Sequence, residues 1–448
     1  MGSDIPDNDP PPDAHSPDRH DMRLPGDPVA AFATGPGITA ATPAYRRLTL
    51  AMVFAGFSTF SLLYSVQPLL PSLAAQFALT AEVASLAVSL ATGPLAIGIL
   101  FAGIVSDRVG RRPLMIAAMF AAGALTLATA VVPGWTGLLV LRLLTGLALA
   151  GVPAVAMAYV AEEIDAKSVG AAMGLYIAGS AIGGMGGRLI ASVVADHASW
   201  RWAVAAVGLA GLAMAEGFRR LAPPSRNFAA SVARPGAVLR GAATLFADRA
   251  MPLLYLEAFL LMGVFVTVYN YAGFRLMGPP YGLSQSAVGA VFLLYMLGSI
   301  SSAKFGTLAG RLGRRTIFWV PVVVLILGVA MTAMRPLAFV IAGIAVVTIG
   351  FFGAHSIASA WVGRRAQTLA GGSSRGQAAA FYLFFYYMGS SVLGSAGGFA
   401  WTHAGWPGVT AFCLVIGIAA LGIGMMLRQV PPLPVEPADR SGAFDPRG

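Results

Sequence analysis

The sequence predicts an all-α membrane protein whose twelve transmembrane helices form two pseudo-symmetric bundles of six. Composition is the first observation behind this prediction. Of the 448 residues, 57% are hydrophobic and only 11% are charged, whereas a soluble domain carries about 25% charged residues. The second observation is a loop pattern that occurs twice, once in each half of the chain. Lipid is the solvent that suits a helical surface so poor in charge.

Twelve apolar runs are long enough to span a bilayer, since a helix needs about 20 residues to cross the hydrocarbon core. They form two sets of six, separated by a polar stretch that contains several prolines. This predicts a first bundle at 46–220, a cytoplasmic linker at 221–250 and a second bundle at 251–429. The candidate spans are 48–70, 83–105, 112–132, 135–158, 169–192 and 201–218, then 252–274, 286–308, 316–334, 337–360, 377–400 and 406–427.

Both ends of the chain are expected in the cytoplasm. Residues 1–45 are rich in proline, aspartate and histidine, so they bury too little surface to fold and predict a disordered tail, and 430–448 form a second tail. Arginine and lysine mark cytoplasmic loops, and the even number of spans places both ends on one side. The basic loops hold Arg108, Arg111, Arg112, Lys167, Arg219, Arg220, Arg226, Arg234, Arg240, Arg249, Arg311, Arg314, Arg315, Arg364, Arg365 and Arg375, whereas the opposite loops hold little beyond Arg201, Arg275 and Arg335.

The repeated loop has the pattern G-x4-R-x-G-R-R. It runs from Gly103 to Arg112 after the second predicted span and from Gly306 to Arg315 after the eighth, at an offset of 203 residues. The same loop at the same place in two six-span halves indicates parallel repeats about an axis along the membrane normal.

Several other classes of protein are not favoured. The net charge is +10. The basic residues lie between the apolar runs rather than along one helix face, so nucleic acid is not an expected partner. The single Cys413 allows no disulfide within the chain. No metal or nucleotide motif occurs in the sequence, so we expect neither a metal site nor a cofactor. An enzyme would be expected to cluster His, Asp and Glu at one membrane face, and the sequence shows no such cluster.

These motifs carry a family resemblance. From about residue 46 to 428 the chain resembles the major facilitator superfamily, whose signature between helices 2 and 3 matches Gly103–Arg112. The stretch LVLRLLTG at 139–146 is similar to the helix 4 signature of proton antiporters, with Thr145 where glutamine is usual. Helix 5 has Ser180 where drug antiporters have proline.

A narrower resemblance is to the acriflavine-sensitivity group of drug/proton antiporters of the bacterial inner membrane. The strings LYSVQPLLPSL, LYIAGSAIGGMGGRL, EAFLLMGVFVTVYNYAGFRLM and YLFFYYMGSS carry it. The resemblance implies a monomer that exports lipophilic drugs or cations in exchange for protons by alternating access. Efflux of a sugar or another polar metabolite is the alternative, and proton-coupled uptake is the less favoured one.

The repeated loop is expected to act as a conformational latch. Asp107 lies at the carboxyl end of a helix, where the helix dipole disfavours an acid. It should therefore contact Arg111, Arg112 or the start of helix 11 beyond Ser373 and Ser374. Anchoring of the topology by arginine alone is the other interpretation, and the second copy has Gly310 in place of the acid. The latch residues are Gly103, Asp107, Arg108, Gly110, Arg111, Arg112, Gly306, Arg311, Gly313, Arg314 and Arg315.

Ionisable residues inside the spans are candidates for proton coupling, because a charge in the bilayer is costly unless it is solvated or paired. Arg142, Glu257 and His355 are the candidates, and matching depths place Glu257 and His355 close together in one layer of the second bundle. A buried glutamate can take up a proton on one side and release it on the other. A static salt bridge or hydrogen bond between them is the alternative interpretation.

The substrate cavity is expected to hold aromatic side chains, little charge and a single acid, which suits lipophilic cations or neutral amphiphiles. Aromatic anchoring at the membrane interface is the alternative for these side chains, and snorkelling is the alternative for Arg188. The cavity candidates are Tyr64, Gln67, Tyr176, Arg188, Asn270, Tyr382 and Tyr386.

Overall fold

The computed structural model describes residues 37–228, 235–370 and 375–431. Within these ranges the secondary structure is helical apart from one bridge, which pairs Ile38 with Ile164. The tails expected at 1–45 and 430–448 lie mostly outside the described residues. The first helix begins at Pro43 rather than near residue 46, because Thr42 caps it by accepting a hydrogen bond from the N–H of Tyr45 and a proline occupies its first turn.

The first half of the chain forms eight helices and one 3-10 turn before the linker. They are α1 (Pro43–Tyr64), η1 (Gln67–Leu69), α2 (Leu70–Phe77), α3 (Ala81–Val109), α4 (Arg111–Thr129), α5 (Trp135–Leu149), α6 (Pro153–Glu163), α7 (Val169–His197) and α8 (Trp200–Leu221). The expected linker contains a short helix, α9 (Pro235–Ala247).

The second half is built from a similar series of helices. It comprises α10 (Met251–Met277), α11 (Gln285–Val291), η2 (Phe292–Leu294), α12 (Tyr295–Leu312), α13 (Arg314–Ile317), α14 (Trp319–Thr332), α15 (Leu337–Ala370) and α16 (Arg375–Gln429). We call the side of the molecule on which α1 begins the terminal face, and the opposite side, with α2 and α11, the far face.

Ten stretches of the described chain are long and apolar enough to cross a membrane. Two features raise this count to the twelve crossings that the sequence predicts. The 55-residue helix α16 breaks at Gly405, whose φ of 58° is not helical, so it makes two crossings. Helix α8, which is not among the ten, has 22 residues and is therefore long enough for one further crossing. Its charged residues Glu216, Arg219 and Arg220 lie near its end. The predicted all-α, two-bundle architecture is confirmed.

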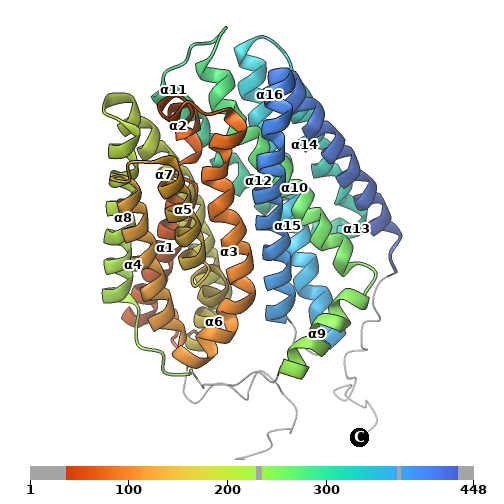
Figure 1. Ribbon diagram of the computed structural model, residues 1–448. Helices are drawn as coiled ribbons and strands as arrows, with labels where there is room; N and C mark the ends of the chain where they lie inside the picture. Colours follow the sequence, from red (N-terminus) through yellow and green to blue (C-terminus); the bar gives the residue numbers. More distant parts are fainter. Residues whose placement is uncertain (1–36, 229–234, 371–374, 432–448) are drawn as a thin grey trace, which may run out of the picture.

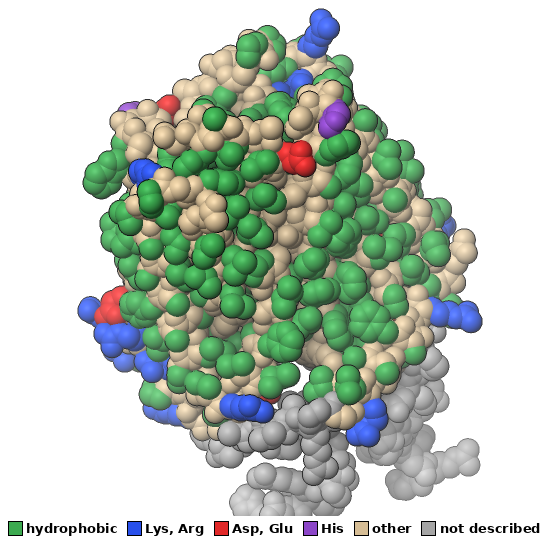
Figure 2. All heavy atoms as spheres, in the orientation of Figure 1, with side chains coloured by type: hydrophobic (Ala, Val, Ile, Leu, Met, Phe, Trp, Pro, Cys, Tyr) green, Lys and Arg blue, Asp and Glu red, His purple; other side chains and the backbone are tan. Residues whose placement is uncertain are grey.

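The two halves stand side by side, with α3 of the first next to α16 of the second (Figure 1). Hydrophobic side chains cover the middle of the molecule, while Lys and Arg gather at its ends (Figure 2). Exposed side chains such as Ile177, Leu209 and Val415 belong to this apolar belt. In lipid such a belt needs no protein partner.

Glycines let helices of one half approach to backbone contact. A side-chain carbon placed on Gly146 of α5 would lie 2.0 Å from the carbonyl oxygen of Ala91 in α3. Gly183 of α7 meets the carbonyl of Phe57 in α1 in the same way, at 2.3 Å. Because lipid gives helices little hydrophobic reason to associate, small residues at such crossings allow the close packing that holds a bundle together.

One buried ion pair fixes the terminal face of the second half. Arg365 of α15 donates from Nε and Nη2 to both carboxylate oxygens of Asp248, at 2.6 and 2.7 Å, and both side chains are buried. Asp248 also accepts from the N–H groups of Ala250 and Met251 at the start of α10. The pair therefore joins the end of α15 to the start of α10.

We expect Asp248→Asn to lower the free energy of unfolding of the purified protein by about 3–5 kcal/mol, because it leaves Arg365 buried without a counter-charge. Thermal unfolding measures this loss as a lower unfolding temperature. Burial alone would raise the pKa of Asp248, but Arg365 and the backbone N–H groups outweigh it and hold the pKa below its ordinary value. The contribution is therefore present at neutral pH and is lost only as the pH falls through this lowered pKa.

Asp165→Asn, in a turn near the surface, is the matched control and should leave the unfolding temperature almost unchanged. An Asp248→Asn protein as stable as the control would contradict the structural role of the pair.

Candidate functional site

The two halves, α1–α8 and α10–α16, meet near the far face. Ser89 of α3 lies 2.6 Å from Ser395 of α16, between their hydroxyl oxygens, and Ser391 donates to the carbonyl of Ser89. Ser85 donates to the hydroxyl of Ser395 as well. These contacts occupy the part of α3 and α16 nearest the far face.

A second set of contacts closes the other side of the same face. Gln285 at the start of α11 donates to the carbonyl of Pro68, and Ser72 donates to the side chain of Gln285. The N–H of Ser286 donates to Asp196 at the end of α7. Among the described residues, every hydrogen bond that joins the two halves lies toward the far face.

Toward the terminal face the halves separate. None of the hydrogen bonds between the halves lies on this side in the described ranges. The lower edge of the molecule is notched between the two halves in Figure 2. The structure is thus closed at the far face and parted at the terminal face.

A buried hydrogen-bonded chain crosses the boundary between the halves just inside the closed face. Arg188 of α7 donates from Nε to the side-chain oxygen of Gln67, at 2.7 Å. The Gln67 amide donates in turn to Asn270 of α10, also at 2.7 Å. The break between α1 and α2, where Pro68 and Pro71 interrupt helical hydrogen bonding, places Gln67 between the two partners.

Aromatic rings from both halves surround the Arg188 guanidinium. Its carbon lies 4.5 Å from the ring centroid of Tyr64, 4.8 Å from Tyr295 and 5.2 Å from Phe292. The side chain is only 2% exposed, and no acid of the described chain pairs with it. Its environment therefore consists of rings, an amide and the carbonyl of Gly184, which argues against snorkelling to the membrane surface.

A continuous aromatic wall leads away from Arg188 into the second half. Tyr295 packs on Phe265, which stacks on Phe351 at 4.0 Å between centroids. Phe351 in turn stacks on His355, at 5.8 Å. The wall thus extends from Arg188 to His355, and its members come from α10, α12 and α15.

His355 pairs with Tyr382 rather than with Glu257. The Tyr382 hydroxyl lies 2.9 Å from Nδ1 of His355, and the ring of Tyr386 lies 5.0 Å from the histidine ring. The structure thus brings the proton-coupling candidate His355 together with two of the cavity candidates, Tyr382 and Tyr386. Tyr382 is buried, while His355 and Tyr386 are partly exposed.

Glu257 is completely buried, and neither of its carboxylate oxygens has a hydrogen-bond partner within the described chain. One of them lies 3.5 Å from the place where a side chain on Gly424 would begin, so the group faces the last part of α16. The direct salt bridge or hydrogen bond between Glu257 and His355 that the sequence left open is therefore not formed, because the turn of α10 aims Glu257 elsewhere.

The Arg142 side chain donates hydrogen bonds to backbone carbonyl groups of two helices. It donates from Nε to the carbonyl of Ala87 and from Nη1 to that of Leu62, both at 3.0 Å, and from Nη2 to the carbonyl of Leu63. Leu62 and Leu63 end α1, where the break before η1 frees carbonyl groups. Arg142 thus caps the interrupted helix and links it to α3.

The remaining cavity candidates are buried tyrosines. The hydroxyls of Tyr64 and Tyr176 are both shielded from solvent and have no hydrogen-bond partner among the described residues. Tyr64 lies against Arg188, whereas Tyr176 lies in the first bundle, where Gly56 of α1 packs on its backbone. Tyr64 belongs to the site around Arg188 and Tyr176 does not contact that arginine.

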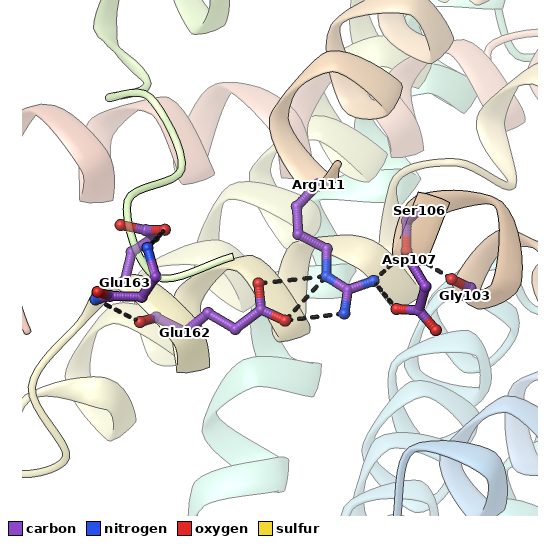
Figure 3. A network of polar contacts seen from close by, with 7 residues as sticks. Gly103, Ser106, Asp107, Arg111, Glu162 and Glu163 are labelled. Atoms are coloured by element: carbon purple, nitrogen blue, oxygen red, sulfur yellow. Dashed lines mark hydrogen bonds and ion pairs between the residues drawn. The ribbon is translucent and has the colours of Figure 1, made fainter. Parts of the chain in front are cut away.

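The first copy of the repeated loop forms a polar network inside the first half (Figure 3). Arg111 lies between Asp107, at 2.5 Å, and Glu162 of α6, at 2.9 Å. Its guanidinium also reaches the hydroxyl of Ser106, which donates to the carbonyl of Gly103. Ser373 and Ser374, the expected partners in helix 11, lie outside the described residues.

The start of the linker is fastened to the same network. Arg112 donates to the carbonyls of Arg219 and Ala222, and Glu163 accepts from the N–H groups of Arg226 and Asn227. Arg108 has no such partner in the described ranges. Gly110 has a φ of 99°, which glycine tolerates and which turns the chain from α3 into α4.

The second copy lacks acids at the matching positions. Gly310 replaces Asp107, and the offset of 203 residues places Arg365 where the first half has Glu162. Gly313 makes the same turn with a φ of 88°. A basic pocket of about 380 Å³ results, lined by Gly313, Arg314, Arg315, Thr316, Trp361, Arg364, Arg365 and Thr368. Arg311 and Gly306 lie on α12, outside this pocket.

Comparison with known proteins decides the family. The sequence model of the family described as the "Major Facilitator Superfamily" matches residues 48–374 of this chain. The chain belongs to this superfamily. It is 44% identical over 388 residues to the inner membrane transport protein YnfM of Escherichia coli (strain K12), spanning 87% of this chain and 92% of YnfM. It is 40% identical over 390 residues to the uncharacterized transporter YybF of Bacillus subtilis (strain 168), spanning 87% of this chain and 95% of YybF.

The same fold occurs in a crystal structure of a bacterial homolog of the human lysosomal transporter Spinster, in its inward-facing and occupied conformation. The TM-score is 0.71 at 14% identity, over 87% of this chain and 98% of that one. The protein is therefore a multi-pass membrane transporter of the major facilitator fold, and the resemblance to this superfamily stated from the sequence is confirmed.

Several site residues were missed by sequence reasoning. Phe292 and Tyr295 contact Arg188, Phe265 and Phe351 form the wall, and Glu162 pairs with Arg111. The aromatic residues at 265, 269, 292 and 295 were one available signal, but rings in a membrane span are too common to be chosen without neighbours.

We expect Arg142→Lys to lower the unfolding temperature even in the absence of any substrate or proton gradient. A lysine cannot reach three carbonyls in two helices, and each buried polar group left unsatisfied costs about 1–3 kcal/mol. Thermal unfolding of the purified protein measures the effect. Arg335→Lys, near the far face, is the control and should leave the unfolding temperature almost unchanged. Wild-type stability with lost proton coupling would instead assign Arg142 to coupling alone.

Proposed function

We propose that this transporter is a proton-coupled antiporter that exports small organic molecules across the bacterial inner membrane by alternating access. The observation that carries the proposal is the one-sided contact between the halves, hydrogen-bonded near the far face and parted near the terminal face. A transporter built from two repeats works by rocking them about a site between them, so that one face closes while the other opens.

Proton coupling rests on Glu257. An ionised carboxylate there has neither a hydrogen-bond donor nor a counter-charge among the described residues, and such a charge costs at least several kcal/mol in a membrane. A bound proton removes this cost. Release of the proton therefore requires a rearrangement that brings water or a donor to Glu257, and this ties proton movement to the conformation. The pair of His355 and Tyr382 supplies a second site for a proton nearer the cavity.

The terminal face is proposed to be cytoplasmic, with both ends of the chain on that side. The basic residues of the repeated loops, of the linker and of the end of α15 lie there, as the asymmetry of positive charge across membranes requires. In this orientation the parted side of the structure faces the cytoplasm. Export then begins with loading from inside, and a monomer contains the complete path.

Lipophilic drugs or cations were the substrates expected from the sequence. That expectation depended on an acid facing the cavity, but Glu257 faces α16, and the deeply buried charge at the boundary between the halves is Arg188. A sugar or another polar metabolite is the alternative substrate, and uptake is the less favoured direction. The network of Asp107, Arg111 and Glu162 is proposed to hold the ends of α3, α4 and α6 together as part of the latch.

We expect Glu257→Gln to abolish substrate-driven proton movement, because glutamine cannot exchange a proton. The measurement is a pH-sensitive dye inside proteoliposomes while candidate substrates are added, with Glu216→Gln, at the exposed end of α8, as the matched control. A Glu257→Gln protein that transports at the normal rate and still moves protons would remove Glu257 from the mechanism.

A further inference from the structure

We propose that Arg188 binds the negative charge of the substrate, so that the transporter carries small organic anions, with carboxylates as the representative class. This inference rests on the proposed transport function and adds the chemical class of the cargo. It reverses the charge expected from the sequence alone.

The balance of buried charge is the first argument. Three charged side chains of the described helices are at most 2% exposed and lie more than one turn from a helix end: Arg142, Arg188 and Glu257. Arg142 is occupied by three carbonyls, and Glu257 faces α16. Arg188 is thus the deeply buried full charge at the boundary between the halves, and it has no acid as partner within the described chain.

Free donors at the site are the second argument. The Arg188 atoms Nε and Nη1 donate to Gln67 and Gly184, while Nη2 has no partner among the described residues. The buried hydroxyl of Tyr64, whose ring lies 4.5 Å from the guanidinium, has no partner either. An unpartnered guanidinium nitrogen and an unpartnered hydroxyl on a neighbouring side chain are donors that a carboxylate can accept.

The aromatic wall is the third argument, because it gives the body of such an anion a surface. Rings continue from Tyr295 through Phe265 and Phe351 to His355, with successive centroids 5.3, 4.0 and 5.8 Å apart. Flat apolar groups stack well on rings in offset or edge-on arrangements. Phe265 and Phe351 are buried in this conformation, so the conjugated body of an acid bound at Arg188 stacks on these rings as the halves rearrange.

Binding of the anion would also act on the contact between the halves. Arg188 now contacts Phe292 and Tyr295 of the second half and, through Gln67, Asn270. An oxyanion on Arg188 competes with these contacts, which hold the far face closed. A ligand shifts a conformational equilibrium only through such differences in contacts between states, so an anion favours opening.

The test is ligand-induced thermal stabilisation of the full-length protein purified in detergent. The probes are benzoate and cinnamate, their neutral amides, and the cation benzamidine, which have similar size and differ in charge. We expect the two carboxylates to raise the unfolding temperature with saturable concentration dependence, with affinity about tenfold or more above that of the amides. Arg188→Gln should abolish this preference and Arg188→Lys should retain part of it.

Arg275→Gln is the matched control, since Arg275 also lies near the far face over aromatic rings but contacts Tyr281 and Trp406 instead. It should keep the preference for carboxylates. If Arg188→Gln does not fold, the test depends on whether the wild-type protein prefers carboxylates to amides and whether Arg188→Lys retains part of that preference.

Equal stabilisation by acids, amides and amidine, stabilisation by benzamidine alone, or none by any probe would overturn the anion site. Proton-coupled transport of cations by the same preparation would then leave the proposed function standing. Carboxylate binding that depends on Arg188, without any proton movement, would instead support the site and contradict proton-coupled export.

Discussion

The burial of arginine inside the membrane is the interaction on which this structure depends, because a guanidinium in lipid has to be satisfied by protein groups. Arg142 is satisfied within one half, by carbonyls that the break in α1 sets free. Arg188 is surrounded by groups of both halves, namely Gln67 and Tyr64 from the first and Phe292 and Tyr295 from the second. The first arginine stabilises a fixed unit, whereas the environment of the second has to change when the halves move.

The two halves share a fold but differ in charge where they reach the terminal face. In the first half Asp107 and Glu162 neutralise Arg111, and the linker packs onto this network. In the second half the matching positions are Gly310 and Arg365, and a basic pocket forms. Repetition thus provides the geometry of two bundles, and the substitutions between the copies give the two loops different charge at the terminal face.

The fold could be predicted almost completely, because apolar runs, basic loops and the repeated G-x4-R-x-G-R-R pattern are properties of the sequence itself. The site could be predicted only in part. Depth along a helix follows from counting residues, and Glu257 and Tyr382 are buried while His355 is partly exposed. Which way a side chain points depends on the rotation of each helix against its neighbours, and this decided that Tyr382 pairs with His355 while Glu257 faces Gly424. The rings around Arg188 come from three segments, so no single stretch of sequence contains that site.

The most direct test of the account is a reversible cross-link across the closed far face. Cys413 is the chain's single cysteine, so a Cys413→Ala background permits Ser89→Cys with Ser395→Cys, whose native hydroxyl oxygens lie 2.6 Å apart. The account predicts that the pair oxidises readily, that the cross-linked protein does not transport in proteoliposomes, and that reduction restores transport. Undiminished transport by the fully cross-linked protein would show that this face need not open, and would contradict alternating access through the contacts around Arg188.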